Sequence, residues 1–405
     1  MPARQPSLRT DDVYRYVREH AVATAGSGRL GVELEWLTYL LGDPASSVRF
    51  EQLRAAVAGP LPGGGRLTFE PGGQVELSSL PHPGIAAAHA AVAADLDVLR
   101  GRLADAGIDL IGLGLDPLRP CHRLVRGPRY DAMEAYFDGG GSAGRRMMCG
   151  TASVQLNLDL MGEGTPGSRW ALAHAIGPVL AAACANSPIV AGRPSGWRSA
   201  RLAVWAAIDR TRTAPALTDD GEPPSDQWAR YALEARVMLV RARPERFVSV
   251  FEHLTFEEWM SSGHELGYPT EDDLAYHLTT LFPPVRLRGW MELRMVDALP
   301  EPWWRVPGAV ATALLDDPAA AAEARAATAP TARLWRQAAR LGLSHPALAA
   351  SARRCFNAAI AALPRLGADP ETQAACATFF DRFVARGRCP ADDVLDRWAA
   401  ERAVA

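Results

Sequence analysis

Four short segments of the chain alternate apolar side chains with acidic or amide side chains. Their central residues read VELEW from Val32, QVEL from Gln74, VQLNL from Val154 and MELR from Met291. This alternation has the period of a β-strand, in which successive side chains point to opposite faces. Each segment therefore predicts a strand with one face in a hydrophobic core and one polar face.

Packed side by side, the four strands would share a polar face crowded with carboxylates. Glu33 and Glu35 are two residues apart, and neither has an arginine within two residues on its own face. Close carboxylates repel one another unless cations lie between them. Oxygen ligands of this kind suit several hard divalent ions, so we predict a metal site. The alternative is an ordinary solvated sheet face.

A glycine-rich turn is predicted to join a strand at residues 66–70 to the second acidic segment. It reads Glu70-Pro-Gly-Gly-Gln74, which is typical of a tight hairpin. We expect Gly72 or Gly73 to take positive φ, which a β-carbon opposes. The turn would hold Glu70 near Glu76.

The remaining elements are predicted from periodicity and from helix-breaking residues. One long strand from Val285 to Val296 would place alternate residues on one polar face, namely Arg286, Arg288, Trp290, Glu292 and Arg294. Helices are expected at residues 11–25 (capped by Thr10 or Asp11), 85–103, 130–137, 168–186 and 195–211. A further helix is expected to end with residues 274–281, and the chain after Pro302 is expected to be helical. A strand is expected at 110–115 and a surface insertion at 215–226. Residues 117–144 are mostly loop, and so long a loop near an acidic sheet is a candidate substrate cover.

Composition excludes several classes of protein. The 405 residues carry a formal net charge of −3 and no clustered basic tract, so we expect no nucleic-acid partner. We find no run of membrane-span length and no apolar signal region, so we expect no membrane partner and a cytoplasmic location. The six cysteines lack metal-ligand spacing and most of them are expected to be buried apolar residues, with a redox pair left open. The oligomeric state is not predicted.

All 43 basic residues are arginines, because the chain contains no lysine. This excludes a phosphate-binding loop with its lysine and a Schiff-base mechanism. An anionic ligand must therefore be held by arginine, metal or backbone N–H groups. One predicted helix face carries Arg198, Arg201, Trp205, Asp209 and Arg212. That face either forms a salt-bridge stripe or binds a substrate carboxylate or phosphate through Arg198 and Arg201.

Five segments resemble the plant-type glutamate–cysteine ligase family, and most closely its actinobacterial branch that supplies γ-glutamylcysteine for ergothioneine synthesis. In order between about residues 28 and 300, they read GVELE, EPGGQVELS, SVQLNLD, RLAVWAAID and HLTTLFP followed by ELR. The resemblance implies an α+β, glutamine-synthetase-like catalytic fold with a curved, largely antiparallel sheet and flanking helices. It implies a catalytic core over residues 1–300, with a helical C-terminal segment at 301–405 packed on that core.

The resemblance also implies the ligands of the concave polar face. This face would bind ATP and two or three Mg²⁺ through Glu33, Glu35, Glu70, Glu76, Gln155 and Glu292. Arg294 would meet glutamate or its acyl phosphate, with Glu292 beside it as the second catalytic residue. From the predicted faces, we expect Arg286, Arg288 and Asn157 to bind substrate or ATP as well. Two residues depart from the family, since Ala152 replaces a frequent cysteine and Trp290 replaces a smaller aromatic residue.

The implied reaction is ATP-dependent ligation of small molecules. ATP would phosphorylate the γ-carboxylate of L-glutamate, and the amino group of L-cysteine would displace phosphate from the acyl phosphate. The products would be γ-glutamylcysteine, ADP and phosphate. Two alternatives remain at this point: a glutamate ligase for another amine, and a non-catalytic homologue that only binds nucleotide or metal.

Overall fold

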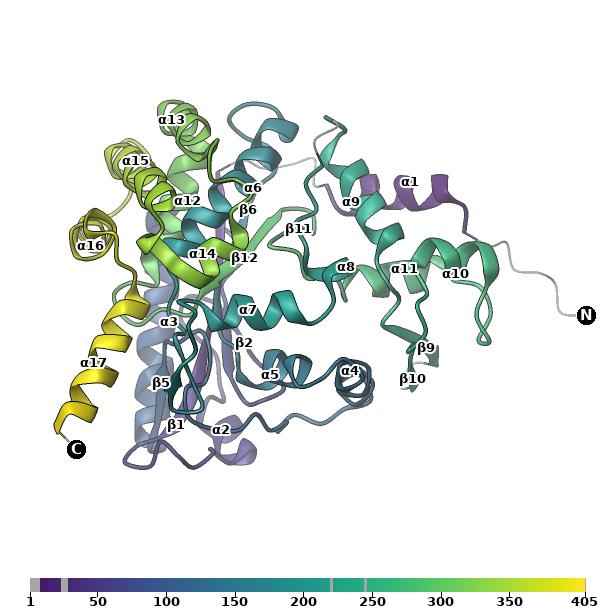
Figure 1. Ribbon diagram of the computed structural model, residues 1–405, viewed down its shortest axis with the longest axis horizontal. Helices are drawn as coiled ribbons and strands as arrows, with labels where there is room; N and C mark the ends of the chain where they lie inside the picture. The colour runs from purple at the N-terminus through teal and green to yellow at the C-terminus, as the bar shows by residue number, and fades with distance from the viewer. Residues whose placement is uncertain (1–7, 23–27, 219–220, 244–245, 405) are drawn as a thin grey trace, which may run out of the picture.

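A central antiparallel sheet organises the structure, a computed structural model that describes residues 8–22, 28–218, 221–243 and 246–404 (Figure 1). The sheet has eight strands in the order β11-β12-β6-β1-β3-β2, with β4 and β5 paired to the two ends of β1. Their bounds are β1 Arg29–Leu40, β2 Arg66–Phe69, β3 Val75–Ser78, β4 His82–Pro83, β5 Ile108–Ile111, β6 Ser153–Leu158, β11 Val285–Leu287 and β12 Met291–Asp297. Two small hairpins complete the strands, namely β7 Ile189–Val190 with β8 Arg193–Pro194, and β9 Leu239–Arg243 with β10 Arg246–Ser249.

The four acidic segments form four consecutive strands, β12, β6, β1 and β3, which confirms the strand prediction. Their register places polar residues opposite one another. Glu35 lies opposite Glu76, and Glu33 lies opposite Gln155. Because directly opposed residues share a face, the polar side chains of all four strands gather on one side of the sheet.

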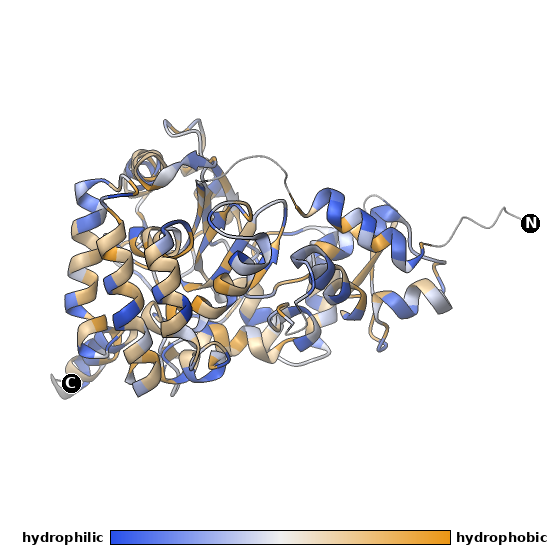
Figure 2. Cartoon of the chain, turned by 90° about the horizontal axis from the view of Figure 1, so that it is seen from above, coloured by the Kyte–Doolittle hydropathy of each residue, from blue (hydrophilic) through white to orange (hydrophobic). Residues whose placement is uncertain are grey.

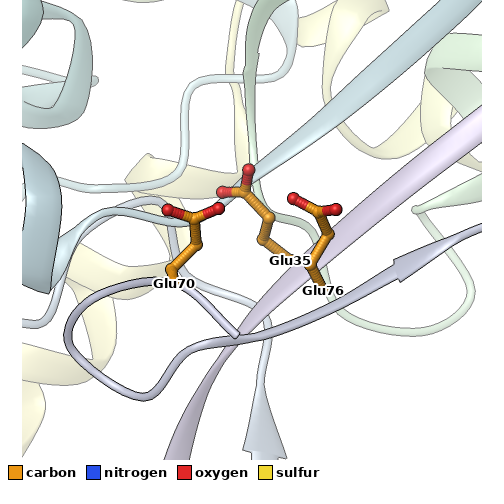
Figure 3. Close-up of side chains that lie close together, drawn as sticks. All are labelled: Glu35, Glu70 and Glu76. Carbon is orange, nitrogen blue, oxygen red and sulfur yellow. The ribbon is translucent and has the colours of Figure 1, made fainter. Parts of the chain in front are cut away.

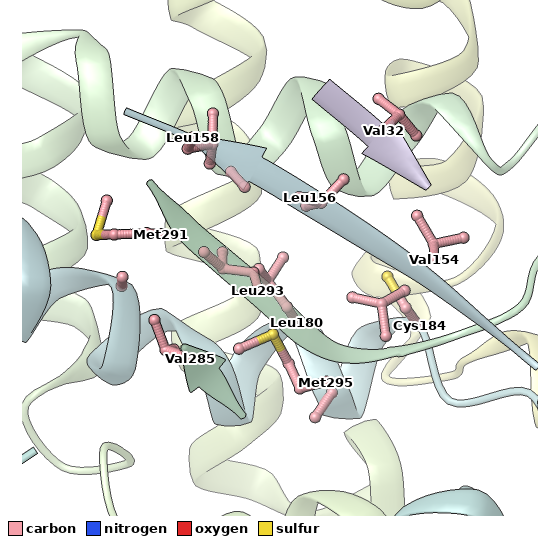
Figure 4. Packing of buried hydrophobic residues seen from close by; sticks show 14 of the residues in the cluster. Val32, Val154, Leu156, Leu158, Leu180, Cys184, Val285, Met291, Leu293 and Met295 are labelled. Carbon is pink, nitrogen blue, oxygen red and sulfur yellow. The ribbon is translucent and has the colours of Figure 1, made fainter. Parts of the chain in front are cut away.

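The other side of the sheet is the apolar face. Val32, Leu34, Leu156 and Leu293 are fully buried there and belong to the main hydrophobic cluster. Figure 4 shows side chains of β6 and β12 packed together, with Leu180 of a covering helix beside them. Each such side chain contributes roughly 1.5–3 kcal/mol by leaving water. This burial fixes which face of each strand points away from the core.

Helices cover the apolar face and extend to both sides of the sheet. Their bounds are α1 Thr10–His20, α2 Phe50–Ala56, α3 Gly84–Asp105, α4 Pro128–Asp138, α5 Ala143–Gly150, α6 Pro166–Ala183, α7 Ala200–Ala207, α8 Arg210–Thr213, α9 Pro224–Glu234, α10 Phe256–Ser262, α11 Glu271–Leu278, α12 Arg305–Asp316, α13 Pro318–Thr328, α14 Trp335–Leu341, α15 Pro346–Ala362, α16 Pro370–Arg382 and α17 Pro390–Val404. Figure 1 places α12–α17 at one end of the molecule and α1, α9, α10 and α11 at the other. In Figure 2 the C-terminal helices show both orange and blue residues, as expected for helices with one buried and one solvated side.

The predicted strand over residues 285–296 is wrong, because the segment is a hairpin. Strands β11 and β12 pair antiparallel, with Arg286 opposite Glu292, and Gly289 between them has a φ of 85°. Opposed residues of a hairpin share a face, so the alternation of polar residues continues across the turn and resembles one strand. Arg286 and Glu292 therefore do share a face, but they are neighbours across two strands.

The predicted helix over residues 195–211 is also wrong, because it is broken into α7 and α8. The oxygen of Ser199 caps α7 by accepting from the N–H of Leu202, and Asp209 caps α8 by accepting from the N–H of Thr211. A side chain that satisfies free N–H groups starts a new helix, so Asp209 cannot continue the face of α7. The five residues expected on one helix face therefore do not share one.

Other boundaries differ by a few residues. Helix α1 begins at Thr10 with Arg9 at its cap and ends at His20, whereas we expected it to continue into residues 23–27, which lie outside the described part of the chain. The strand expected at residues 110–115 is β5, Ile108–Ile111. Helix α9 begins at Pro224, inside the segment 215–226 that was expected as a surface insertion, and its residues Trp228 and Leu233 are buried. The β9–β10 hairpin was not predicted.

The burial of the cysteines and the length of the helices bear on two expectations from composition. All six cysteines are free thiols, and five are buried while Cys121 is half-buried. Burial raises the pKa of Cys149 to about 12, so this thiol stays protonated at neutral pH. None of the helices in the described ranges is both long enough and apolar enough to span a bilayer.

Candidate active site

The polar face of the sheet lines a cavity of about 420 Å³. It contains most of the residues predicted from the sequence as ligands, namely Glu33, Glu35, Glu70, Glu76, Gln155, Arg201, Arg286, Arg288, Glu292 and Arg294. Arg198 and Asn157 are the two predicted residues that do not line it. The fold therefore brings together side chains from β1, β3, β6, α7, β11 and β12, which are spread over more than half of the chain.

Three carboxylates form a tight cluster at one end of this cavity. One carboxylate oxygen from each of Glu35, Glu70 and Glu76 lies within 4.8 Å of the other two. Figure 3 shows the three side chains converging from strand β1, the turn after β2 and strand β3. Glu76 also accepts hydrogen bonds from the hydroxyls of Thr68 and Ser78, at 2.8 and 2.9 Å.

The electrostatics of the cluster show an excess of negative charge. Burial, together with the nearby Glu76 carboxylate, raises the pKa of Glu35 to about 7. Burial and the carboxylates of Glu35 and Glu76 raise the pKa of Glu70 well above its ordinary value, and burial also raises that of Glu33. Within the described residues, no arginine or histidine forms an ion pair with any of these four acids. A set of buried and half-buried carboxylates without an ion-pair partner fits a hard divalent ion.

The turn after β2 positions Glu70 through two glycines, as predicted. Gly73 has a φ of 84°, and its N–H donates to the carbonyl of Glu70 at 2.8 Å. A β-carbon on Gly72 would lie 2.1 Å from the carbonyl oxygen of Cys149. The side-chain amide of Gln74 donates to the carbonyl of Thr151 at 2.8 Å, which ties the turn to the start of β6. Backbone packing therefore sets where the Glu70 carboxylate lies.

Arginines surround Glu292 at the other end of the cavity. Both Glu292 oxygens accept from Arg286, at 2.5 and 3.0 Å, and Arg294 lies 3.1 Å away. Burial alone would raise the pKa of Glu292, but the guanidinium groups of Arg286 and Arg294 lower it to about 2. Arg288 is half-exposed and 3.9 Å from the same carboxylate. Glu292, which was predicted as a metal ligand, thus forms ion pairs with Arg286 and Arg294 in this structure.

Two amide side chains connect the acidic and basic halves of the cavity. Gln155 donates to Glu35 at 2.7 Å and accepts from the guanidinium of Arg294. Asn157 donates to Glu33 at 2.9 Å and accepts from the indole of Trp290 at 2.8 Å. Trp290, which departs from the family pattern, therefore orients Asn157. Asn157 does not line the cavity itself, but its hydrogen bond helps to orient Glu33, which does.

The two arginines predicted from the 195–211 segment have different surroundings. Arg201 is buried in the cavity wall and donates to the carbonyl of Arg294 at 2.9 Å. Arg198 pairs with Asp392 of α17 at 2.7 Å, away from the cavity. The structure therefore leaves Arg201 as a candidate for substrate binding and gives Arg198 a contact with the C-terminal helix.

Sequence reasoning gave no role in the site to several lining residues, and half of those named next come from helices α4 and α5 before β6. The cavity is also lined by Arg66, Arg129, Tyr130, Met133, Met147, Met148, Ser153, Trp205, Thr279 and Phe282. Residues 117–144 were predicted as a candidate substrate cover, and Arg129, Tyr130 and Met133 of this segment line the cavity; a covering role stays a prediction. No spacing pattern singles these three residues out, because α4 reaches the sheet only through tertiary packing.

Comparison with known proteins defines the class. The family model "Glutamate-cysteine ligase family 2 (GCS2)" matches residues 29–404, beyond the region 28–300 that carried the resemblance. The chain belongs to this family. It is 43% identical over 414 residues to glutamate–cysteine ligase EgtA of Mycolicibacterium smegmatis, covering 99% of this chain and 96% of that protein. It is 33% identical over 247 residues to the chloroplastic glutamate–cysteine ligase of Brassica juncea, covering 59% of this chain and 47% of that protein.

A solved structure confirms the fold class. The glutamate–cysteine ligase (gshA) of Francisella tularensis in complex with AMP superposes with a TM-score of 0.55, covering 92% of this chain and 85% of that chain. The sequence identity over this match is 13%, so the likeness shows the fold. The predicted α+β architecture of an antiparallel sheet with flanking helices is confirmed.

Proposed function

We propose that this chain joins the γ-carboxylate of L-glutamate to the amino group of L-cysteine, using ATP and two or three Mg²⁺. The products are γ-glutamylcysteine, ADP and phosphate. The observation that carries this proposal is one cavity with two opposite ends, an acidic cluster around Glu35 and an arginine cluster around Glu292. The family and the EgtA-type relative support it. We also propose a cytoplasmic location, where ATP is available, and a product used for ergothioneine synthesis.

The acidic end would hold the metal ions. Glu35 supplies a buried carboxylate and Glu70 and Glu76 supply half-buried ones, with Glu33 and Gln155 lining the same cavity. Metal ions bound there would offset the charge of the ATP phosphates and of the phosphoryl group in transfer. Glu292 is a weaker candidate ligand than the others, because both its oxygens already accept from Arg286.

The arginine end would bind the γ-carboxylate and its acyl phosphate. Arg294 is fixed by Glu292 and Gln155, and Gln155 links its guanidinium to Glu35 of the acidic cluster. A guanidinium fixed before substrate arrives does not have to reorganise as negative charge develops, which favours the transition state. Arg288 is half-exposed and can reach a phosphate oxygen without breaking a short ion pair. These arginines replace the lysine that the chain lacks.

The reaction is then two substitutions in one site. A γ-carboxylate oxygen held by Arg294 attacks the terminal phosphorus of ATP, and ADP leaves. The cysteine amino group attacks the acyl carbon, phosphate leaves, and the amine loses one proton. Water would compete for the acyl phosphate, so the apolar side chains of Met133, Met147 and Met148 in the cavity wall serve to exclude it.

We propose that residues 1–300 carry this chemistry and that residues 301–405 support the sheet from behind. Helix α12 packs on β1 and β6, and its buried residues Val306, Val310 and Leu314 belong to the same hydrophobic cluster as Leu156. The C-terminal segment then contributes to the reaction only indirectly, by stabilising the strands that carry the ligands.

Phosphate release from ATP tests the function directly. We expect release in the presence of Mg²⁺ and glutamate to require an amine, and cysteine to give the highest kcat/KM among amino acids. A close analogue such as 2-aminobutyrate should be accepted modestly less well, because a small thiol pocket discriminates weakly. A higher kcat/KM for another amine would support a different glutamate ligase. No stimulation by any amine, although Mg-ATP binds, would support the non-catalytic alternative.

A further inference from the structure

A second cavity, of about 500 Å³, shares a wall with the acidic cavity. It is lined by residues of α7 and α14 and by the segment leading into β11. Figure 1 shows α7 between α14 and α5, and α5 lines the acidic cavity. Arg201, Trp205, Phe282 and Arg294 line both cavities. A volume of this size is typical of sites for small molecules.

The hollow exists because α7 presents small side chains to it. Ala203, Ala206 and Ala207 are spaced by three and four residues, so they lie on one helix face. Aromatic rings from separate segments form other parts of the wall, among them Trp197 and Trp335. Indole rings of this kind offer flat apolar surfaces to an aromatic or planar ligand.

The charge of this cavity is opposite to that of the acidic cavity. Five arginines line it, namely Arg201, Arg210, Arg294, Arg333 and Arg336, and among its described lining residues there is no aspartate or glutamate. The guanidinium groups of Arg210 and Arg336 form no hydrogen bond or ion pair within the described part of the chain. Both side chains are exposed, so they are available to an anion at the mouth of the cavity.

Buried donors in the shared wall also lack acceptors. Arg201 is 3% exposed, and its Nε and Nη1 atoms have no hydrogen-bond partner. The Asp297 carboxylate forms an ion pair with Arg201, but its distance of 3.8 Å from Nη1 is too long for a hydrogen bond. The indole N–H of Trp205 is likewise buried without an acceptor. Since buried donors are normally paired, a ligand that supplies acceptor oxygens would satisfy these atoms, and it could do so from either cavity because Arg201 and Trp205 line both.

We propose that this second cavity binds a small organic anion with a flat apolar body, separately from the substrates of the ligase reaction. The tryptophan rings contact the body of the ligand, and Arg210 and Arg336 pair with its carboxylate. This goes beyond the proposed function, which places no substrate between α7 and α14. Its test uses binding alone, so its outcome does not depend on whether the chain is a cysteine ligase.

The probe is 1-naphthylacetate, with the neutral 1-naphthylacetamide as its matched control. Isothermal titration calorimetry with the full chain should detect the acid and show at least about tenfold weaker binding of the amide, because the amide cannot form a charge-assisted pair. Arg336→Gln and Arg210→Gln should each weaken the acid by roughly fivefold or more and leave the amide unchanged. Arg340→Gln, an exposed arginine of α14 outside the cavity lining, should have no effect.

A cavity-filling variant tests the location. Ala206→Phe should abolish binding of both probes, and circular dichroism and thermal unfolding should show that each variant is folded. Saturating Mg-ATP and glutamate should leave the acid bound. The proposal is overturned by undetectable binding of the acid, by equal binding of acid and amide, by normal binding to Ala206→Phe, or by complete displacement by Mg-ATP and glutamate.

Discussion

Glu35 of β1 and Glu76 of β3 lie directly opposite each other on adjacent strands, with both carboxylates on the polar face of the sheet. Directly opposed like charges destabilise a sheet by their repulsion. The pair is retained here next to Glu70, without an arginine paired to it in the described residues. Such an arrangement costs stability in the absence of a cation and favours the binding of one.

Replacing Glu35 with glutamine should separate metal use from folding. The variant keeps the shape of the side chain and removes one of two opposed charges, so we expect a melting temperature at or above that of the parent. Turnover should fall roughly a hundredfold or more, because a charge-stabilising contact is lost. Phosphate release and thermal unfolding measure the two effects. Glu19→Gln, on the exposed side of α1, is the control, and near-normal turnover of Glu35→Gln at saturating Mg²⁺ would contradict the assignment.

Stabilisation by Mg²⁺ should increase with pH. The pKa of Glu35 is raised to about 7, so protonation stabilises the metal-free fold below the ordinary glutamate pKa, and this stabilisation is lost as pH rises through 7. Metal binding requires the ionised carboxylate. The rise in melting temperature caused by Mg²⁺ should therefore be larger at about pH 8 than at about pH 6. In Glu35→Gln the difference between the two pH values should shrink, and an unchanged difference would assign the effect to other groups.

Alanine at either turn glycine should weaken both the fold and metal use. Gly72→Ala would bring a β-carbon within 2.1 Å of the Cys149 carbonyl, and Gly73→Ala would force a residue with a β-carbon to a φ of 84°. We expect about 1–3 kcal/mol of destabilisation for each, with weaker binding of Mg-ATP. Gly101→Ala is the matched control, since this position lies in α3 with open space around it. Alanine there should raise the free energy of unfolding by about 0.5–1 kcal/mol. Unchanged Mg-ATP binding in both turn variants would show that the turn does not position Glu70.

Replacing Glu292 with glutamine should have the opposite effect on stability from Glu35→Gln. Glu292 neutralises the buried Arg286, which would be left without its ion pair. Loss of one partner of a buried pair costs about 3–5 kcal/mol. Urea unfolding measures this cost, and activity should be lost as well because Arg294 loses an anchor. Equal stability of Glu292→Gln and the parent would contradict the structural role of the pair.

Two arginines predicted together from the sequence should behave differently. Arg294→Gln should reduce turnover by roughly a hundredfold or more, because its guanidinium lies in the cavity. Arg198→Gln should keep kcat and KM within about twofold and cost at most about 1 kcal/mol, because Arg198 pairs with Asp392 at a partly exposed position. Steady-state kinetics of both variants test this, and a large rise in the KM for glutamate in Arg198→Gln would restore its predicted role in substrate binding.

The sequence alone determined the strands that carry the acidic residues. Apolar and polar residues alternate around Glu33, Glu76, Gln155 and Glu292, and this pattern depends only on the period of a strand and on the burial of its apolar face. It also determined the hairpin turn after β2, because few residues tolerate the positive φ that Gly73 takes. These features are local, so they can be read without knowing which segments pack together.

Tertiary structure decided how those local elements meet. It placed Arg286 and Glu292 on two paired strands of a hairpin rather than on one strand, and it separated Arg198 from Arg201. It also placed Arg129 in the lining of the acidic cavity and formed the second cavity between α7 and α14. In each case the contacts join residues far apart in the chain or depend on a turn between two similar patterns. An alternating pattern specifies which face of a strand is buried. Which strands pair with it, and which residues lie opposite its polar side chains, depends on the packing of the whole chain.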